Sequence, residues 1–192
     1  MYTIFKSKAR KHEGLLGGLT KRFIEKKLIR YAAEHRHTMP QMAMFSQDFQ
    51  AWQIALFGRF ERDELDDLFE FLKPVRDRIE QGVALDIGAN IGNHTAFFSN
   101  KFANVYAFEP SPDIFTLLRF NTRNFANVKL FNFGLGSHKR SAQLVGFDEN
   151  LTESRVAPMG NETKGVNVEL ETLDALLTDD PAAVTFIKID IE

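Results

Sequence analysis

The clearest hydrophobic pattern in the chain begins at Val83, where aliphatic side chains form a short continuous run. Residues 83–87 read Val-Ala-Leu-Asp-Ile, which is typical of a strand buried on both faces. A Gly-x-x-x-Gly segment from Gly88 to Gly92 follows, and the pattern becomes helical from Thr95. A strand, a glycine loop and a helix in this order predict a cradle whose backbone N–H groups face a ligand above the end of the strand.

The rest of the pattern predicts helices and strands along the chain. The expected helices cover residues 63–80, 95–101, 111–120 and 172–177. The expected strands cover residues 104–110, 128–133, 142–146, 166–170 and 184–192. Pro74 is expected to kink the first helix. The strand at 166–170 alternates apolar and polar side chains, so it is expected at a sheet edge.

The last expected strand carries an unusual charge pattern. At a period of two, Lys188, Asp190 and Glu192 share one face, and isoleucines occupy the other face. Charges in the carboxyl end of a parallel strand are costly unless that end opens onto a site. The competing interpretation is a structural ion pair between Lys188 and a neighbouring acid. The sequence slightly favours the site.

The first 37 residues hold a concentration of positive charge. They contain ten Lys/Arg and three acids, in a chain whose net charge is −2. Apolar residues recur at helical spacing and predict an amphipathic helix with a basic polar face: Leu16, Leu19, Phe23, Ile24, Leu28 and Tyr31. Such a helix either makes a weak peripheral contact with an anionic membrane or polyanion, or packs its apolar stripe on the domain. Packing is the favoured interpretation, and residues 1–57 are interpreted as a helical N-terminal extension.

Composition narrows the class of protein. The chain has 192 residues and no cysteine, which excludes disulfides, thiolate metal sites and a cysteine nucleophile. No run of 18 apolar residues is present, so no membrane span is expected. The N-terminus lacks the apolar core of a signal peptide, and a cytoplasmic location is therefore expected.

The ligand of the predicted cradle follows from the residues in it. A pyrophosphate-binding turn has a second glycine where this chain has Asn90, and Asp86 would repel a phosphate. This disfavours an NAD-dependent oxidoreductase and favours a cationic nucleoside such as S-adenosylmethionine. Glu109 ends the next expected strand, 21 residues after Gly88. That offset matches a carboxylate that accepts hydrogen bonds from ribose hydroxyls.

Several motifs resemble the FkbM-type family of class I S-adenosylmethionine-dependent methyltransferases. They are the segments at 85–92, 106–110, 135–136 and 188–192, and the resemblance covers about residues 58–192. It implies an α/β fold with a Rossmann-like, doubly wound, mostly parallel sheet that is C-terminally incomplete. It also implies the following cofactor-binding residues: Asp86, Gly88, Ala89, Asn90, Gly92, Asn93, Glu109, Pro110, Leu135 and Gly136.

The resemblance implies O-methylation of a sugar or another small hydroxylated acceptor. Asp190 is the expected general base, with Glu192 and His94 as further candidates, because an oxygen acceptor must lose a proton. No cluster at ligand spacing predicts a metal. A non-catalytic nucleoside-binding or scaffold module of a glycan-assembly system is the alternative. A nucleic-acid partner is not expected, since the basic segment is far from the motifs along the chain.

Overall fold

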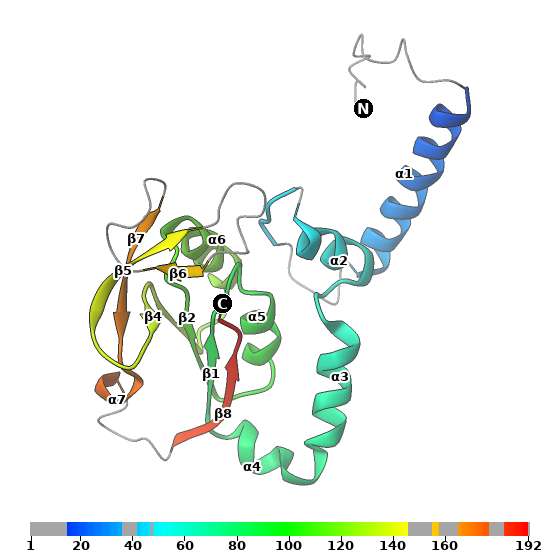
Figure 1. Cartoon of the computed structure of the whole chain (residues 1–192). Coiled ribbons are helices and arrows are strands. Elements are labelled where there is room, and N and C mark those ends of the chain that lie inside the picture. Colours follow the sequence, from blue (N-terminus) through cyan, green and yellow to red (C-terminus); the bar gives the residue numbers. More distant parts are fainter. Residues whose placement is uncertain are drawn as a thin grey trace.

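The computed structural model describes residues 15–35, 42–46, 48–145, 155–157, 165–176 and 183–191 (Figure 1). The helices are α1 (Leu15–His35), α2 (Phe49–Phe57), α3 (Arg62–Phe71), α4 (Arg76–Glu80), α5 (Asn93–Ser99), α6 (Pro112–Thr122) and α7 (Leu173–Leu176). The strands are β1 (Val83–Ile87), β2 (Asn104–Phe108), β3 (Val128–Phe131), β4 (Gly134–Leu135), β5 (Arg140–Val145), β6 (Arg155–Ala157), β7 (Val166–Glu171) and β8 (Val184–Ile189).

The main sheet is parallel and has the strand order β3-β2-β1-β8. The chain passes from β1 through α5 to β2 and then through α6 to β3, which builds the sheet outward from β1. It later returns to add β8 on the opposite side of β1. Ligands of such sheets bind outside the carboxyl ends of the strands, where the strand order reverses. The predicted Rossmann-like, doubly wound sheet is confirmed.

The two faces of the main sheet have different cover. Ala84 of β1 packs in a cluster with Phe69 of α3 and with Phe97 and Phe98 of α5. Leu85 faces the other way, where α7 and the chain that follows β3 cover the strands. Helices α3 and α5 therefore lie on one side of the sheet and the second sheet on the other, as Figure 1 shows. Side chains alternate across β1, so Asp86 shares the α5 side with Ala84.

The second sheet has the order β4-β7-β5-β6 and mixes parallel and antiparallel pairs. The expectation that residues 166–170 form an edge strand is wrong. β7 lies between β4 and β5, and its apolar residues Val168 and Leu170 pack with Ala142 and Leu144 of β5. The alternating pattern arose because one face of this sheet is buried and the other exposed.

Pro74 interrupts the helix expected over 63–80, as predicted. It lies in a single 3-10 turn, Lys73–Val75, between α3 and α4. A proline lacks the N–H that a continuous helix needs at this point. The break turns the chain, so that α4 leads directly into β1.

The segment before the sheet-bearing part divides into two regions. Ile54 of α2 packs with Ile91 and Ile114, and Met42 and Met44 join the same cluster. These residues are therefore packing residues, whereas Phe49 and Trp52 of the same segment are 67% and 63% exposed.

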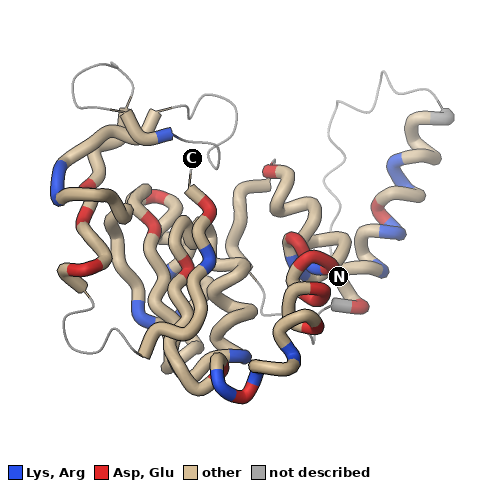
Figure 2. Tube along the Cα trace, turned by 60° about the horizontal axis from the view of Figure 1, so that its bottom comes forward, with Lys and Arg blue, Asp and Glu red and all other residues tan. Residues whose placement is uncertain are grey.

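Helix α1 differs from its expectation. Its apolar side chains are exposed: Leu19 by 56%, Phe23 by 62%, Ile24 by 57%, Leu28 by 43% and Ile29 by 63%. The prediction that they pack on the domain is wrong, because α1 extends away from the sheets (Figure 1). Figure 2 shows lysine and arginine residues spaced along the same helix. Among the described residues, no helix has the length and apolar character of a membrane span. The cytoplasmic location stays a prediction.

Candidate functional site

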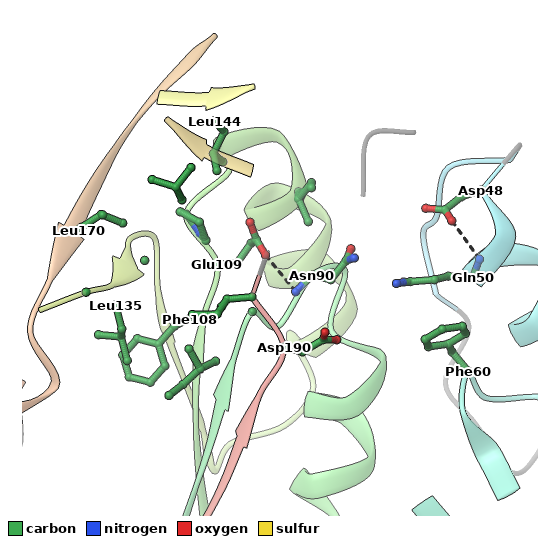
Figure 3. A pocket seen from close by; sticks show the side chains of 18 of the residues that line it. Asp48, Gln50, Phe60, Asn90, Phe108, Glu109, Leu135, Leu144, Leu170 and Asp190 are labelled. Atoms are coloured by element: carbon green, nitrogen blue, oxygen red, sulfur yellow. Dashed lines mark hydrogen bonds between the residues drawn. The ribbon is translucent and has the colours of Figure 1, made fainter. Parts of the chain in front are cut away.

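A cavity of about 490 Å³ opens at the carboxyl ends of β1 and β2 and beside the end of β8. This volume lies within the range of small-molecule sites. One wall comes from Asp48, Gln50 and Phe60, before and within α2 and ahead of α3. The opposite wall comes from the second sheet, including Leu144 and Leu170. Figure 3 shows these two walls with Asn90, Glu109 and Asp190 between them.

The glycine loop after β1 is shaped by close backbone approaches. Gly88 has φ +75°, and a Cβ atom there would collide with the backbone carbonyl of Asp190. Gly92 has φ +90°, and its Cβ would lie 2.7 Å from Leu118 of α6. Asn90 also has a positive φ, of 50°, and its side-chain Oδ1 accepts a hydrogen bond from the N–H of Ile91. Only glycine fits the first two positions without moving β8 or α6.

Glu109 lies at the end of β2 and closes the floor of the cavity. Its Oε2 accepts a hydrogen bond from the N–H of Asn90 at 3.0 Å, and its Oε1 accepts one from the N–H of Ser111 at 2.8 Å. Burial raises the pKa of Glu109 to about 7, although both N–H groups oppose this. Each carboxylate oxygen has a further lone pair, so the group has the capacity to accept hydrogen bonds from a ligand with hydroxyls.

Asp86 is fully buried and belongs to a linked polar group beneath the glycine loop. Its Oδ2 accepts a hydrogen bond from the Thr95 hydroxyl at 2.6 Å, and its Oδ1 lies 3.2 Å from Lys188 Nζ. Lys188 also donates to the backbone carbonyl of Gly88 at 2.8 Å and lies 3.5 Å from Asp190 Oδ2. Asp190 is largely exposed and lines the cavity. Lys188 thus forms the structural ion pair that was one interpretation of this strand. Asp190 lines the cavity, as the other interpretation, a site, requires.

A carboxylate and a histidine form a further pair at the cavity. Glu61 lines the cavity, and its Oε2 lies 3.2 Å from Nε2 of His94. Burial and the charge of Asp190 raise the pKa of Glu61, while burial lowers the pKa of His94. The His94 imidazole is therefore neutral at pH 7. It stacks on Phe60 with ring centroids 6.2 Å apart.

The structure brings seven of the sequence-predicted site residues to the cavity. They are Gly88, Asn90, Glu109, Pro110, Leu135, Gly136 and Asp190. Glu192 lies outside the described residues.

Four predicted cofactor-binding residues do not line the cavity: Asp86, Ala89, Gly92 and Asn93. The carboxylate of Asp86 does not line the cavity, because it is buried against Thr95 and Lys188. The side chain of Asn93 is engaged by the backbone of Phe60. Asp86 and Asn93 therefore flank and support the glycine loop without lining the cavity.

Other cavity residues were missed by the sequence reasoning. Gln50, Glu61 and Arg140 belong to segments for which no ligand contact was expected. No spacing in the sequence links Glu61 to Asp190, since more than a hundred residues separate them. Arg140 is one basic residue at the start of a strand, and only the pairing of β5 with β7 brings it to the cavity.

The residues present fit S-adenosylmethionine. The buried carboxylate of Glu109 faces the cavity with spare acceptor capacity, which suits ribose hydroxyls. Leu135 and Leu170 provide apolar surface beside it. Within the part of the chain that the structure describes, no group of His, Cys, Asp or Glu side chains has an arrangement that could hold a metal.

Comparisons with known proteins agree with this fit. The model of the Methyltransferase FkbM domain family matches residues 86–192. The hexuronic acid methyltransferase AglP of Haloferax volcanii is 34% identical over an alignment that covers 58% of this chain and 56% of that protein. The chain thus spans about half the length of this curated relative.

Two solved structures also match in part, with low overlap. A precorrin 8w decarboxylase of Methanobacterium thermoautotrophicum has a TM-score of 0.28 and 20% identity, over 34% of this chain and 37% of its own. A SAM-dependent methyltransferase of Leishmania major has a TM-score of 0.27 and 19% identity, over 41% and 33%. The family match covers more than half of the chain and includes the end of β1, the glycine loop, β2 and β8, so the chain belongs to the FkbM methyltransferase family.

Proposed function

We propose that the chain binds S-adenosylmethionine and methylates a hydroxyl oxygen of a sugar. The observation that carries this proposal is the position of Glu109, a buried carboxylate that faces a cavity at the switch point of the sheet. Membership of the FkbM methyltransferase family supports the same reaction.

The cofactor side of the cavity would use four residues. Glu109 would accept hydrogen bonds from the ribose hydroxyls. The backbone of the loop at Gly88 and Asn90 would approach the ligand closely. Leu135 would supply an apolar wall for the adenine ring. When bound, S-adenosylmethionine supplies an electrophilic methyl group on a positively charged sulfur.

The acceptor side would lie between Asp190 and the wall formed by Asp48, Gln50 and Phe60. Carboxylates and an amide are suitable partners for sugar hydroxyls, and an aromatic ring packs well against the apolar face of a sugar. The relative AglP is a hexuronic acid methyltransferase, which makes a hexuronic acid the first acceptor to test. Asp190 would orient the acceptor hydroxyl, with Lys188 holding its carboxylate in position.

We also propose that α1 makes a peripheral contact with an anionic membrane surface. The exposed apolar side chains of the helix support this, together with five basic residues against two acidic ones: Lys21, Arg22, Lys26, Lys27 and Arg30 against Glu25 and Glu34. Apolar groups and positive charge on one exposed helix favour binding at the interface of an anionic bilayer.

The proposed cofactor is tested by titration calorimetry of the full-length protein with S-adenosylhomocysteine and, separately, NADH. We expect the wild-type protein to bind S-adenosylhomocysteine and not NADH. We expect Glu109→Ala to lose the binding of S-adenosylhomocysteine. The matched control is Glu169→Ala, which changes an exposed carboxylate on β7 and should leave binding unchanged. Binding of NADH instead would contradict the proposal. Methyl transfer to glucuronic acid then separates an enzyme from a non-catalytic nucleoside-binding module.

A further inference from the structure

We infer that Glu61 is the general base that takes the proton of the acceptor hydroxyl, and that His94 is the residue that positions it. This inference rests on the proposed methyltransferase function and assigns a residue on its acceptor side. Four observations carry it: the backbone conformation of Glu61, the clamp on its neighbour Phe60, the unpartnered nitrogen of His94, and the ion pair that occupies Asp190.

Glu61 has a backbone conformation that glutamate rarely adopts. Its φ is 50° and its ψ is 44°, in the left-handed region, at the residue that precedes α3. The side chain makes no capping hydrogen bond with that helix, so capping does not explain the residue. A non-glycine residue held in this region costs on the order of 1 kcal/mol or more and persists where the surroundings require it. In this conformation Glu61 lines the cavity.

The backbone of Phe60, which precedes Glu61, is held by the side chain of Asn93, the residue after the glycine loop. Asn93 Oδ1 accepts a hydrogen bond from the N–H of Phe60 at 3.1 Å, and Asn93 Nδ2 donates to the carbonyl of Phe60 at 3.2 Å. Since Asn93 is buried at the start of α5, the two bonds fix Phe60 relative to the loop that ends β1. Glu61 follows directly, so its position is tied to the cofactor loop.

The imidazole of His94 lies behind the Glu61 carboxylate. The side chain is only 8% exposed, and its Nε2 has no hydrogen-bond partner although it lies 3.2 Å from Glu61 Oε2. A buried ring nitrogen without a partner is costly. A small turn of the half-exposed Glu61 carboxylate would satisfy it. His94 thus favours orientations of Glu61 that leave the second carboxylate oxygen toward the cavity.

Asp190 is held differently from Glu61. Its carboxylate lies 3.5 Å from the Lys188 ammonium, so it is engaged in an ion pair at the end of β8. Glu61 faces a neutral imidazole and the negative charge of Asp190 instead, and both burial and Asp190 raise its pKa. The charge of Glu64 also raises the pKa of Glu61, and the charge of Lys188 lowers it.

The proton transfer itself is simple. The O–H bond of the acceptor would break as its oxygen bonds to the methyl carbon, and the proton would form an O–H bond with Glu61. The C–S bond of the bound cofactor would break in the same displacement, and its electron pair would leave with the sulfur as S-adenosylhomocysteine. Because the Glu61 side chain is 45% exposed, the proton then passes to solvent without a relay through the interior. A general base of this kind contributes a factor of about 10² to 10⁴ in rate.

The test compares Glu61→Gln, Asp190→Asn and the control Glu70→Gln in the full-length protein. Glu70 is exposed further along α3 and undergoes the same change of charge. Methyl transfer to glucuronic acid and binding of S-adenosylhomocysteine are measured for each variant. We expect kcat to fall at least about 100-fold in Glu61→Gln and less in Asp190→Asn. Glu70→Gln should stay within about twofold, and all three should bind the nucleoside normally.

A second measurement needs no turnover. The carboxyl carbon of Glu61 is titrated by NMR in the ligand-free protein, in Asp190→Asn and in His94→Phe. We expect the Glu61 pKa to fall toward its ordinary value in Asp190→Asn, because a repelling charge is lost. His94→Phe keeps the stacking on Phe60 but removes the nitrogen. In the separate turnover assay it should lower kcat and move the acidic limb of the pH–rate profile. The groups facing this histidine are Asp86, Lys188, Asp190 and Arg59.

The outcomes separate the two proposals. Normal nucleoside binding with an unchanged kcat in Glu61→Gln would overturn the assignment of Glu61 and leave the methyltransferase function standing. A larger loss in Asp190→Asn than in Glu61→Gln would assign the base to Asp190. Failure of the wild-type protein to bind S-adenosylhomocysteine would overturn the proposed function itself.

Discussion

Lys188 Nζ lies 3.2 Å from Oδ1 of Asp86, a carboxylate that is fully buried between β1 and α5. The two residues are also register partners in the pairing of β1 with β8. The ion pair therefore joins the two strands at the switch point of the sheet, directly below the glycine loop.

Removing the lysine should leave a buried charge without its partner. Breaking a buried pair from one side costs about 3–5 kcal/mol, so Lys188→Met should lower the free energy of unfolding by an amount of that order. The double variant Asp86→Asn with Lys188→Met should lose less than the sum of the single variants. Urea denaturation of all four proteins gives the coupling energy. Additive effects would mean that the pair contributes nothing.

Gly88 should not tolerate a side chain. Alanine there would adopt a positive φ and collide with the Asp190 carbonyl, so Gly88→Ala should cost about 2–4 kcal/mol in unfolding free energy. It should also abolish binding of S-adenosylhomocysteine. Gly136→Ala is the matched control for stability, because its nearest neighbour would lie at 3.6 Å and no positive φ is involved. Equal stability of the two variants would contradict this account of the loop.

Glu109 should give stability and binding opposite dependences on pH. Its folded-state pKa of about 7 lies above its ordinary value, so the ligand-free folded state binds a proton that the unfolded state has released. Its contribution to stability is full below pH 4.5 and is lost as the pH rises to 7, by on the order of 3 kcal/mol. Denaturation of wild-type and Glu109→Gln protein at several pH values measures this difference.

Ligand binding should instead improve as the pH rises. The ionised carboxylate is the form that accepts two ribose hydrogen bonds, and about a tenth of Glu109 is ionised one pH unit below its pKa. The affinity for S-adenosylhomocysteine should therefore increase about tenfold from pH 6 to 8. Glu109→Gln should bind weakly with no such dependence. A flat profile in the wild type would show that Glu109 does not contact the ligand in ionised form.

Asn93 should act on stability and not on cofactor affinity. Asn93→Ala removes both hydrogen bonds to Phe60 and should cost about 1–3 kcal/mol, measured by urea denaturation. Exposed Asn124→Ala is the control and should change little. Nucleoside affinity should stay within about threefold, which corresponds to less than 1 kcal/mol. A larger loss of affinity would return Asn93 to the cofactor-binding residues that the sequence predicted.

Helix α1 should bind anionic vesicles. Phe23→Asp removes exposed apolar surface and adds a repelling charge, so it should reduce co-sedimentation with vesicles that contain phosphatidylserine. Phe71→Asp makes the same change at an 80% exposed position on α3 and should have no effect. Binding should also weaken with added salt, because exposed charges are screened. Equal binding to neutral vesicles would contradict the charge complementarity.

The sequence by itself determined the order of the elements at the centre of the sheet. A buried apolar run, a pair of glycines and an acid at the end of the next strand are local signals, each fixed by residues close together in the chain. They predicted β1, the loop at Gly88 and β2 correctly, and the role of Glu109 as a ribose-binding residue stays a prediction. The break at Pro74 follows from the chemistry of one residue. The period of two placed Lys188 and Asp190 on one face, and they lie 3.5 Å apart, while their role in a site stays a prediction.

The tertiary structure decided which charges meet. Asp86 and Glu109 both follow apolar strand residues, yet one is buried under the loop and the other faces the cavity. Glu61 and Asp190 line the same cavity although they are far apart in the sequence, because the end of β8 and the residue before α3 are brought together by packing. The exposure of α1 likewise depends on the absence of a receiving surface among the described residues. Local periodicity fixes the face of an element on which a side chain lies, but the partner of that face comes from packing between segments distant in sequence.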